Sequence, residues 1–291
     1  MAETYVKQRE KVGRKDVSRP ANPEPLTVPV FDNHCHLEIA DGDDALTLAE
    51  QLDRAAAVGV AGVVQASGDI ASSQWAAEAA ESDSRVLAAV AIHPNDAPIY
   101  AAEGRLDEAI RIIDELAGRP RVRAIGETGL DYFRTDEEGR PAQMASFEAH
   151  IALAKKHGIA MQIHDREAHR DVLDTLIRVG APERTVFHCF SGDEDMAREA
   201  AEHGYWLSFA GNVTFKNAQN LRDALAVTPR ERILVETDAP FLTPAPFRGR
   251  PNAPYLVPIT MRFMAAELGA DVDELCAQVR QNTIDVYGEF A

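Results

Sequence analysis

The chain has 291 residues, 45% of them hydrophobic, so it can bury a large core, and overall disorder is excluded. Its 47 acidic and 30 basic residues give a formal charge of −17, which argues against a broad electrostatic hold on DNA, RNA or an anionic membrane. Three cysteines without a CxxC pair, no apolar signal core and no long apolar run lead us to expect a cytoplasmic protein that does not cross a membrane.

The first 27 residues differ in composition from the rest of the chain. They are polar, include six basic residues and end in a stretch with three prolines. We expect residues 1–27 to form a flexible arm or an extension that packs on an edge, ahead of a single domain at 28–291. A basic arm is able to touch nucleic acid, but a solvated tail is the simpler interpretation.

From Val28 onward, short apolar runs alternate with longer segments of helical periodicity. Eight such units predict a (β/α)₈ TIM barrel, which the segments 255–268 and 271–287 would close as final helices. A doubly wound open sheet is the alternative, although the chain lacks a GxGxxG turn. The predicted strands are 28–36, 59–67, 86–93, 122–131, 159–164, 184–190, 206–211 and 232–238.

Histidines and acids gather at the C-terminal ends of these strands. In a barrel, strand ends meet at one face, where buried acids repel one another unless positive charge lies among them. Divalent metal ions meet that demand, and a carboxylate such as Glu127 can bridge two of them. Glu236 is the least certain member, since a supporting or core role is plausible for it. The set comprises His34, His36, His93, Glu127, His164, His188, Glu236 and Asp238.

Cysteines beside these histidines are not expected to be ligands. His34 and His36 are two residues apart on one strand, so both side chains point to the same side, whereas Cys35 points to the helix layer. The same alternation argues against Cys189, which follows His188. Asp32 shares the parity of His34 and His36, so it is expected on their side of the strand.

Seven polar segments follow one another along the chain: FDNHCHL (31–37), IHP (92–94), GETGLDY (126–132), QIHDREA (162–168), HCFSG (188–192), ETDAPFL (236–242) and RGRPNAP (248–254). Together they resemble the motifs of the TatD family of metal-dependent deoxyribonucleases, within the wider amidohydrolase superfamily. The resemblance covers residues 28 to about 288 and leaves out only the arm. Asp165 departs from the serine that the family often has there, so no substrate contact is inferred at that position.

The resemblance implies a hydrolase with two divalent ions, which would be magnesium, manganese or zinc. One ion would be held by His34, His36, Glu127 and Asp238, and the other by Glu127, His164 and His188. His93 would touch the substrate phosphate, and Asp238 would orient or deprotonate the attacking water. Arg248 and Asn252 would bind phosphate, or they would act as a structural clamp of their loop.

We therefore expect a deoxyribonuclease of the 3'-5' exonuclease type that acts on single-stranded or frayed DNA, with no obligate protein partner. The low number of basic residues favours a substrate held near its end. One alternative is hydrolysis of a lactone, cyclic amide or aminoacyl ester, although none of the six lysines falls on a predicted strand end to bridge two ions. The other alternative is a non-catalytic metal-binding scaffold.

Overall fold

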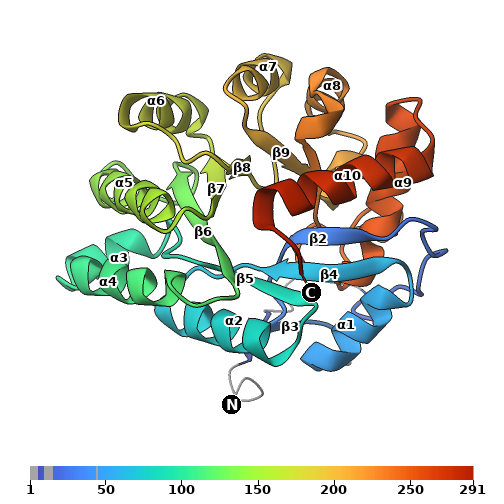
Figure 1. Ribbon diagram of the computed structural model, residues 1–291, viewed down its shortest axis with the longest axis horizontal. Coiled ribbons are helices and arrows are strands. Elements are labelled where there is room, and N and C mark those ends of the chain that lie inside the picture. The colour runs from blue at the N-terminus through green and yellow to red at the C-terminus, as the bar shows by residue number, and fades with distance from the viewer. Residues whose placement is uncertain (1–5, 10–15, 44, 291) are drawn as a thin grey trace.

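A (β/α)₈ barrel is the architecture of the protein in a computed structural model that describes residues 6–9, 16–43 and 45–290. In that part of the chain, eight parallel strands form one sheet in the order β10-β9-β8-β7-β6-β5-β4-β2, and helices surround it (Figure 1). The predicted barrel is confirmed. None of the helices among the described residues is long and apolar enough to span a bilayer.

Each predicted strand of the barrel is present, with ends that differ from the predicted ones by a few residues. A separate pair of short strands, β1 (Lys7–Gln8) and β3 (Ile39–Ala40), was not predicted. The barrel strands are β2 (Val30–Cys35), β4 (Val60–Gln65), β5 (Val86–Val90), β6 (Val122–Asp131), β7 (Ala160–Arg166), β8 (Thr185–Phe187), β9 (Trp206–Phe209) and β10 (Ile233–Val235).

The helices follow the strands in the regular alternation of the fold. Helix α1 begins with a capping box at Thr47 and Glu50, and α5 ends at Gly158, which adopts a left-handed conformation with φ 61°. The α-helices are α1 (Leu48–Ala56), α2 (Ile70–Ser82), α3 (Ala97–Ala102), α4 (Leu106–Ala117), α5 (Arg140–His157), α6 (His169–Val179), α7 (Glu194–Glu202), α8 (Gln219–Val227), α9 (Val257–Glu267) and α10 (Val272–Tyr287). Short 3₁₀ helices are η2 (Gly211–Thr214), η3 (Arg230–Arg232) and η4 (Pro254–Leu256).

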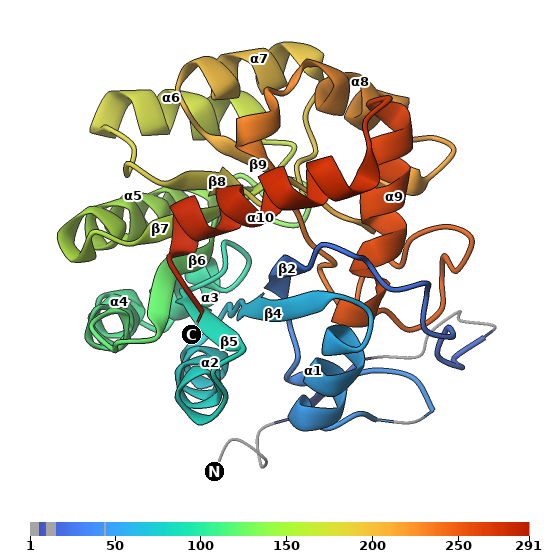
Figure 2. The same cartoon turned by 45° about the vertical axis from the view of Figure 1, so that its right-hand side comes forward.

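The apolar core has two parts. The larger lies between the strands and the helices, and the smaller fills the barrel interior below the site, with side chains such as Val64, Leu87 and Leu234. Helix α10 crosses that end of the barrel (Figures 1 and 2), and the ring of Phe290 stacks on Phe31 with 4.1 Å between centroids. This end is therefore closed by side chains, which leaves the opposite end for chemistry.

Strand β2 does not keep a strict alternation. Its pairing with β4 shifts register on both sides of the Phe31–Asp32 pair. As a result Phe31 packs in the barrel interior, and His34, three residues later, also points inward, toward the open end. Regular alternation would place these two side chains on opposite sides of the strand. Cys35 is fully buried in the outer core, as predicted.

The seam between β2 and β10 is closed by hydrogen bonds that join the last strand to the first. The backbone N–H of Asp238 donates to His34 O at 2.9 Å, and that of His36 donates to Ala239 O at 2.7 Å. The buried carboxylate of Asp32 accepts from the backbone N–H of Thr237 at 2.9 Å and from its hydroxyl. The seam thus places Asp238 beside His34 and His36.

Residues 7–9 and 17–19 of the arm lie beside the loops at the open end of the barrel, whereas residues 22–26 run past α1 and α9 toward the other end, where the N–H of Leu26 donates to Val58 O. Strand β1 pairs in parallel with β3 in the loop between β2 and α1. The guanidinium of Arg9 lies 3.1 Å from the Asp41 carboxylate, 4.8 Å above the Phe241 ring, and also donates to Pro240 O. These contacts hold residues 7–9 against the loops after β2 and β10, while Lys11, Arg14 and Lys15 of the predicted basic arm lie outside the described residues.

Replacing Asp32 by alanine is expected to weaken the seam. The N–H and hydroxyl of Thr237 would lose their buried acceptor, at a cost of about 2–3 kcal/mol in the free energy of unfolding. A lower urea midpoint with an unchanged slope would report this loss. Glu137→Ala, which removes an exposed acid, serves as the control, and equal midpoints for the two variants would contradict the assignment.

Candidate metal centre

Six predicted ligands come together at the open end of the barrel, although they lie on strands far apart in the sequence. His34 lies in β2 and His36 follows it, Glu127 lies in β6 and His164 in β7. His188 and Asp238 follow β8 and β10 by one and three residues. The carboxyl ends of parallel strands converge on one face, which explains why such distant residues meet.

The first group surrounds Oε2 of Glu127. The Nε2 atoms of His34 and His36 are 3.2 Å apart, and each lies 3.6 Å from Glu127 Oε2. Oδ1 of Asp238 completes the group at 3.8 Å from His34 Nε2 and 3.6 Å from His36 Nε2. Four donor atoms thus face a common point.

The second group surrounds the other oxygen of the same carboxylate. Oε1 of Glu127 lies 2.6 Å from His164 Nδ1 and 2.8 Å from His188 Nε2. His93 also enters this group, because its Nε2 is 3.3 Å from Glu127 Oε1. The sequence placed His93 beside the ions as a substrate contact, and the described geometry also permits it to donate to an ion.

Each of three histidines is held in orientation by a side chain on its far side. Nδ1 of His34 is 3.0 Å from Gln162 Oε1, and Nδ1 of His188 is 3.3 Å from Glu236 Oε1. A partner of this kind fixes the ring tautomer and the direction of the nitrogen that binds metal. Glu236 therefore occupies the supporting position that was one of its two predicted roles.

Asp131 performs the same task for His164 and was missed by sequence reasoning. Its Oδ2 is 3.1 Å from His164 Nε2, while the Asn95 amide donates to it at 3.1 Å. The signal was present in the segment GETGLDY, where Asp131 has the parity of Glu127 on the same strand. Gln162 was missed as well, because a neutral side chain gives no signal of metal chemistry.

Backbone geometry allows β6 and β7 to approach closely beside the site. Gly129 has φ 142°, and a Cβ atom there would lie only 2.1 Å from His164 O. A side chain would force the strands apart, so glycine is required at this position. The close approach brings Glu127 and Asp131 to the two nitrogens of His164.

The charges of the group favour a cation between them. Burial alone would raise the pKa of Glu127, but the imidazoles of His188 and His93 outweigh it and hold that pKa well below its usual range. Burial would lower the pKa of His36, but Asp238, Glu38 and Glu127 raise it to about 9. In the protein alone, a proton on the imidazole therefore supplies positive charge that a divalent ion would supply instead.

The donor set fits divalent ions by its chemistry and its spacing. Ligand atoms at about 2.1 Å from a tetrahedral zinc lie about 3.4 Å from one another, and the separations in the first group are 3.2–3.8 Å. Burial lowers the pKa of His34, with a contribution from His188, which favours the neutral imidazole that metals bind. Among the residues that the structure describes, Oε2 of the buried Glu236 finds no hydrogen-bond partner.

Arg248 and Asn252 occupy different positions at the rim. The exposed guanidinium of Arg248 lies 4.1 Å above the Phe215 ring, whereas Asn252 is buried and its amide donates to Thr237 O at 2.9 Å and to Phe241 O. Asn252 thus clamps its loop, which was the structural interpretation of this residue. Phosphate binding by either side chain stays a prediction.

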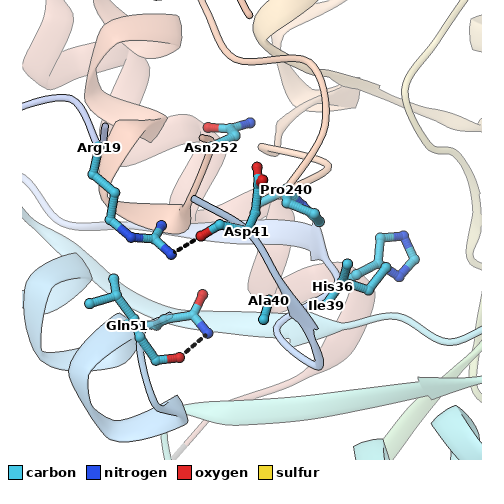
Figure 3. A pocket seen from close by; sticks show the side chains of 10 residues that line it. Arg19, His36, Ile39, Ala40, Asp41, Gln51, Pro240 and Asn252 are labelled. Atoms are coloured by element: carbon cyan, nitrogen blue, oxygen red, sulfur yellow. Dashed lines mark hydrogen bonds between the residues drawn. The ribbon is translucent and has the colours of Figure 1, made fainter. Parts of the chain in front are cut away.

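A small pocket lies beside His36, on the side of the mouth that is bordered by the arm (Figure 3). Its wall includes Arg19, Asp41, Pro240 and Asn252, and Arg19 donates to the backbone oxygen of Asp41. The arm, the loop after β2 and the loop after β10 thus form one continuous edge of the mouth.

Comparison with known proteins gives consistent results. A family model described as TatD related DNase matches residues 31–288. An uncharacterized metal-dependent hydrolase, TatD, from Mycobacterium tuberculosis is 42% identical and covers 89% of this chain and 98% of its own length. YabD of Bacillus subtilis, also named an uncharacterized metal-dependent hydrolase, is 36% identical over 87% of this chain and 96% of its own. The crystal structure of YJJV, a TatD homologue from Escherichia coli, superposes with a TM-score of 0.80 at 25% identity, covering 89% of this chain and 97% of that one.

Replacing Glu236 by glutamine is expected to weaken metal binding by about 10- to 100-fold, because His188 loses its charged orienting partner. Titration of the apoprotein with Mn²⁺ or Zn²⁺ against a competing chelator measures the change. Glu231→Gln makes the same chemical change at an exposed position just before β10 and should leave the affinity as it is. Equal affinities for the two variants would show that Glu236 does not support a metal ligand.

Proposed function

Since the chain belongs to the TatD-related DNase family of metal-dependent hydrolases, we propose that it hydrolyses phosphodiester bonds of single-stranded or frayed DNA, as a 3'-5' exonuclease, with two divalent ions. One observation carries the proposal. The two oxygens of the Glu127 carboxylate face two separate groups of histidines, Oε2 toward His34 and His36 and Oε1 toward His164 and His188. A carboxylate placed between two such groups could be shared by a pair of divalent ions, which would supply the charge for phosphodiester hydrolysis.

The ions would be held by His34, His36, Glu127 and Asp238 on one side and by Glu127, His164 and His188 on the other. When bound, two divalent ions lower the pKa of a water molecule and neutralise charge on a phosphate. Zinc and manganese suit the imidazole-rich donor set, and magnesium suits its carboxylates.

The protein side chains supply orientation and proton transfer. Asp238 is at the open edge of the first group with a side chain 14% exposed, so it can orient the attacking water and accept its proton. His93 has a side chain 17% exposed beside the second group, and it can donate a hydrogen bond to a phosphate oxygen as negative charge develops there. Arg248 is exposed at the rim, where its guanidinium can pair with a phosphate.

Charge on the rest of the molecule favours a substrate held near its end. A net charge of −17 repels a long duplex, so the positive charge that binds the scissile phosphate must be local. A single-stranded or frayed end requires only a few contacts in the mouth. For the same reason we expect the protein to have a low affinity for duplex DNA when no metal ion is bound.

Replacing Asp238 by asparagine is expected to lower kcat on end-labelled single-stranded DNA by at least about 100-fold, because the carboxylate that accepts the proton is lost. Metal-reconstituted wild-type protein and the variant are compared on single-stranded DNA, abasic-site DNA and a lactone panel. Asp285→Asn, an exposed change in α10, is the control. Turnover of lactones alone would replace the phosphodiesterase proposal, and an active Asp238→Asn variant would remove the proposed role of Asp238.

Metal-free protein is expected to bind a 30-base-pair duplex weakly, with a dissociation constant above about 10 μM near physiological salt, because few cations face the phosphates. Fluorescence anisotropy at several salt concentrations gives this value. Tight and strongly salt-dependent binding would contradict the argument from net charge.

A further inference from the structure

An exposed aromatic ring stands at the rim of the metal centre. The large hydrophobic side chains exposed in the described part of the chain are Val6, Ile99, Phe133 and Ile177, and Phe133 is the aromatic one among them. It is 57% exposed. The neighbouring Arg134, Asp136 and Glu137 are exposed and charged, so the ring is isolated and does not belong to an apolar patch of the size that protein interfaces use.

The backbone connects Phe133 directly to the site. Its N–H donates to Asp131 Oδ1 at 3.0 Å, and the other oxygen of this carboxylate is 3.1 Å from His164 Nε2. The ring thus follows, by two residues, a side chain that touches a proposed metal ligand. The carboxylate that orients His164 thus also fixes the backbone that carries the ring.

A guanidinium covers one face of the ring. The Cζ atom of Arg166 lies 3.9 Å from the centroid of Phe133. Arg166 is two residues beyond His164 on β7, so it has the same parity and lies nearer the mouth. Its backbone oxygen accepts from the N–H of Tyr132 at 2.9 Å, and Asp131 pairs with Arg166 in register. The pairing of the C-terminal ends of β6 and β7 thus places the two side chains next to each other.

The pair has the chemistry that recognises an unstacked base. A rigid aromatic ring backed by a guanidinium offers a π-face and a positive charge, and bases stack on such surfaces with little regard for sequence. A neutral lactone or small aliphatic amide has neither a base to stack on the ring nor a phosphate to pair with the guanidinium. The half-buried guanidinium of Arg166 would also attract the adjoining phosphate in an otherwise acidic molecule.

We propose that Phe133 and Arg166 form a binding site for one nucleobase of the substrate strand, on the β6–β7 side of the metal centre. The inference rests on the proposed function and narrows it to single-stranded nucleic acid with a base next to the bond that is cleaved. Stacking holds this base, while the phosphate beyond it reaches the metal centre.

The test uses the metal-loaded enzyme and two fluorescent dodecamers, one of single-stranded DNA and one of tetrahydrofuran spacers that keeps every phosphodiester but has no bases. Phe133→Ala is expected to raise KM for DNA about tenfold with little change in kcat. The wild-type enzyme should already show the higher KM on the spacer strand, and Phe133→Ala should not raise it further. Phe133→Tyr should restore the KM for DNA, since tyrosine keeps the ring.

One control variant and one further test variant separate stacking from other effects. Ile177→Ala removes a 49% exposed apolar side chain on α6 and should leave both KM values unchanged. Arg166→Lys keeps the charge but loses the planar group, and it should raise KM for DNA more than for the spacer strand. An equal rise on both strands for Phe133→Ala would overturn the proposal, as would no rise on either.

Failure of the proposed function has a different result. If the wild-type enzyme cleaves neither dodecamer, the phosphodiesterase proposal fails, and equilibrium binding of both strands by anisotropy then tests the base site alone. The base site would be supported if the protein binds DNA more tightly than the spacer strand and if Phe133→Ala abolishes this difference. Equal binding of the two strands would overturn it.

Discussion

The buried carboxylate of Glu127 is the group on which the whole site depends. Its two oxygens contact imidazoles from four other strands or strand ends, and each oxygen serves a different group. A carboxylate in such a position is stable only because positive charge surrounds it, and the low pKa of Glu127 expresses that balance. The imidazoles in turn need acceptors behind them, which Gln162, Asp131 and Glu236 provide.

Closure of the barrel is the second condition for the site. His34 and Asp238 are more than 200 residues apart in the chain, yet the seam bonds hold them within 3.8 Å. Asp32 contributes to this closure and not to the ligand set. Burial raises the pKa of Asp32 to about 7, even though the bonds from Thr237 favour its ionised form. The acid of the first histidine-rich segment therefore acts in assembly.

The sequence predicted the barrel and the convergence of the histidines and acids at one face because both depend on local patterns. Apolar runs define the strands, and a polar residue at a strand end must lie at the common face. The prediction that side chains alternate strictly between the two sides of the strand was wrong in β2, where the register shift lets Phe31 and His34 both face inward. Gln162 could not be assigned, since its role is set by which ring lies opposite it across two strands, whereas Asp131 could have been placed at the open face by its parity with Glu127. The pairing of β1 with β3 was not predictable either, because it depends on the shape of the loop after β2.

The two ends of the described chain lie at opposite ends of the barrel. Residues 6–9 border the mouth, where Arg9 contacts Pro240, while Phe290 lies on the closed end and its backbone oxygen accepts from Arg121. A dye attached at the exposed Val6 would therefore share the entrance with incoming molecules. Attachment of the protein to a sensor surface through a residue near Phe290 would instead leave the entrance facing the solution.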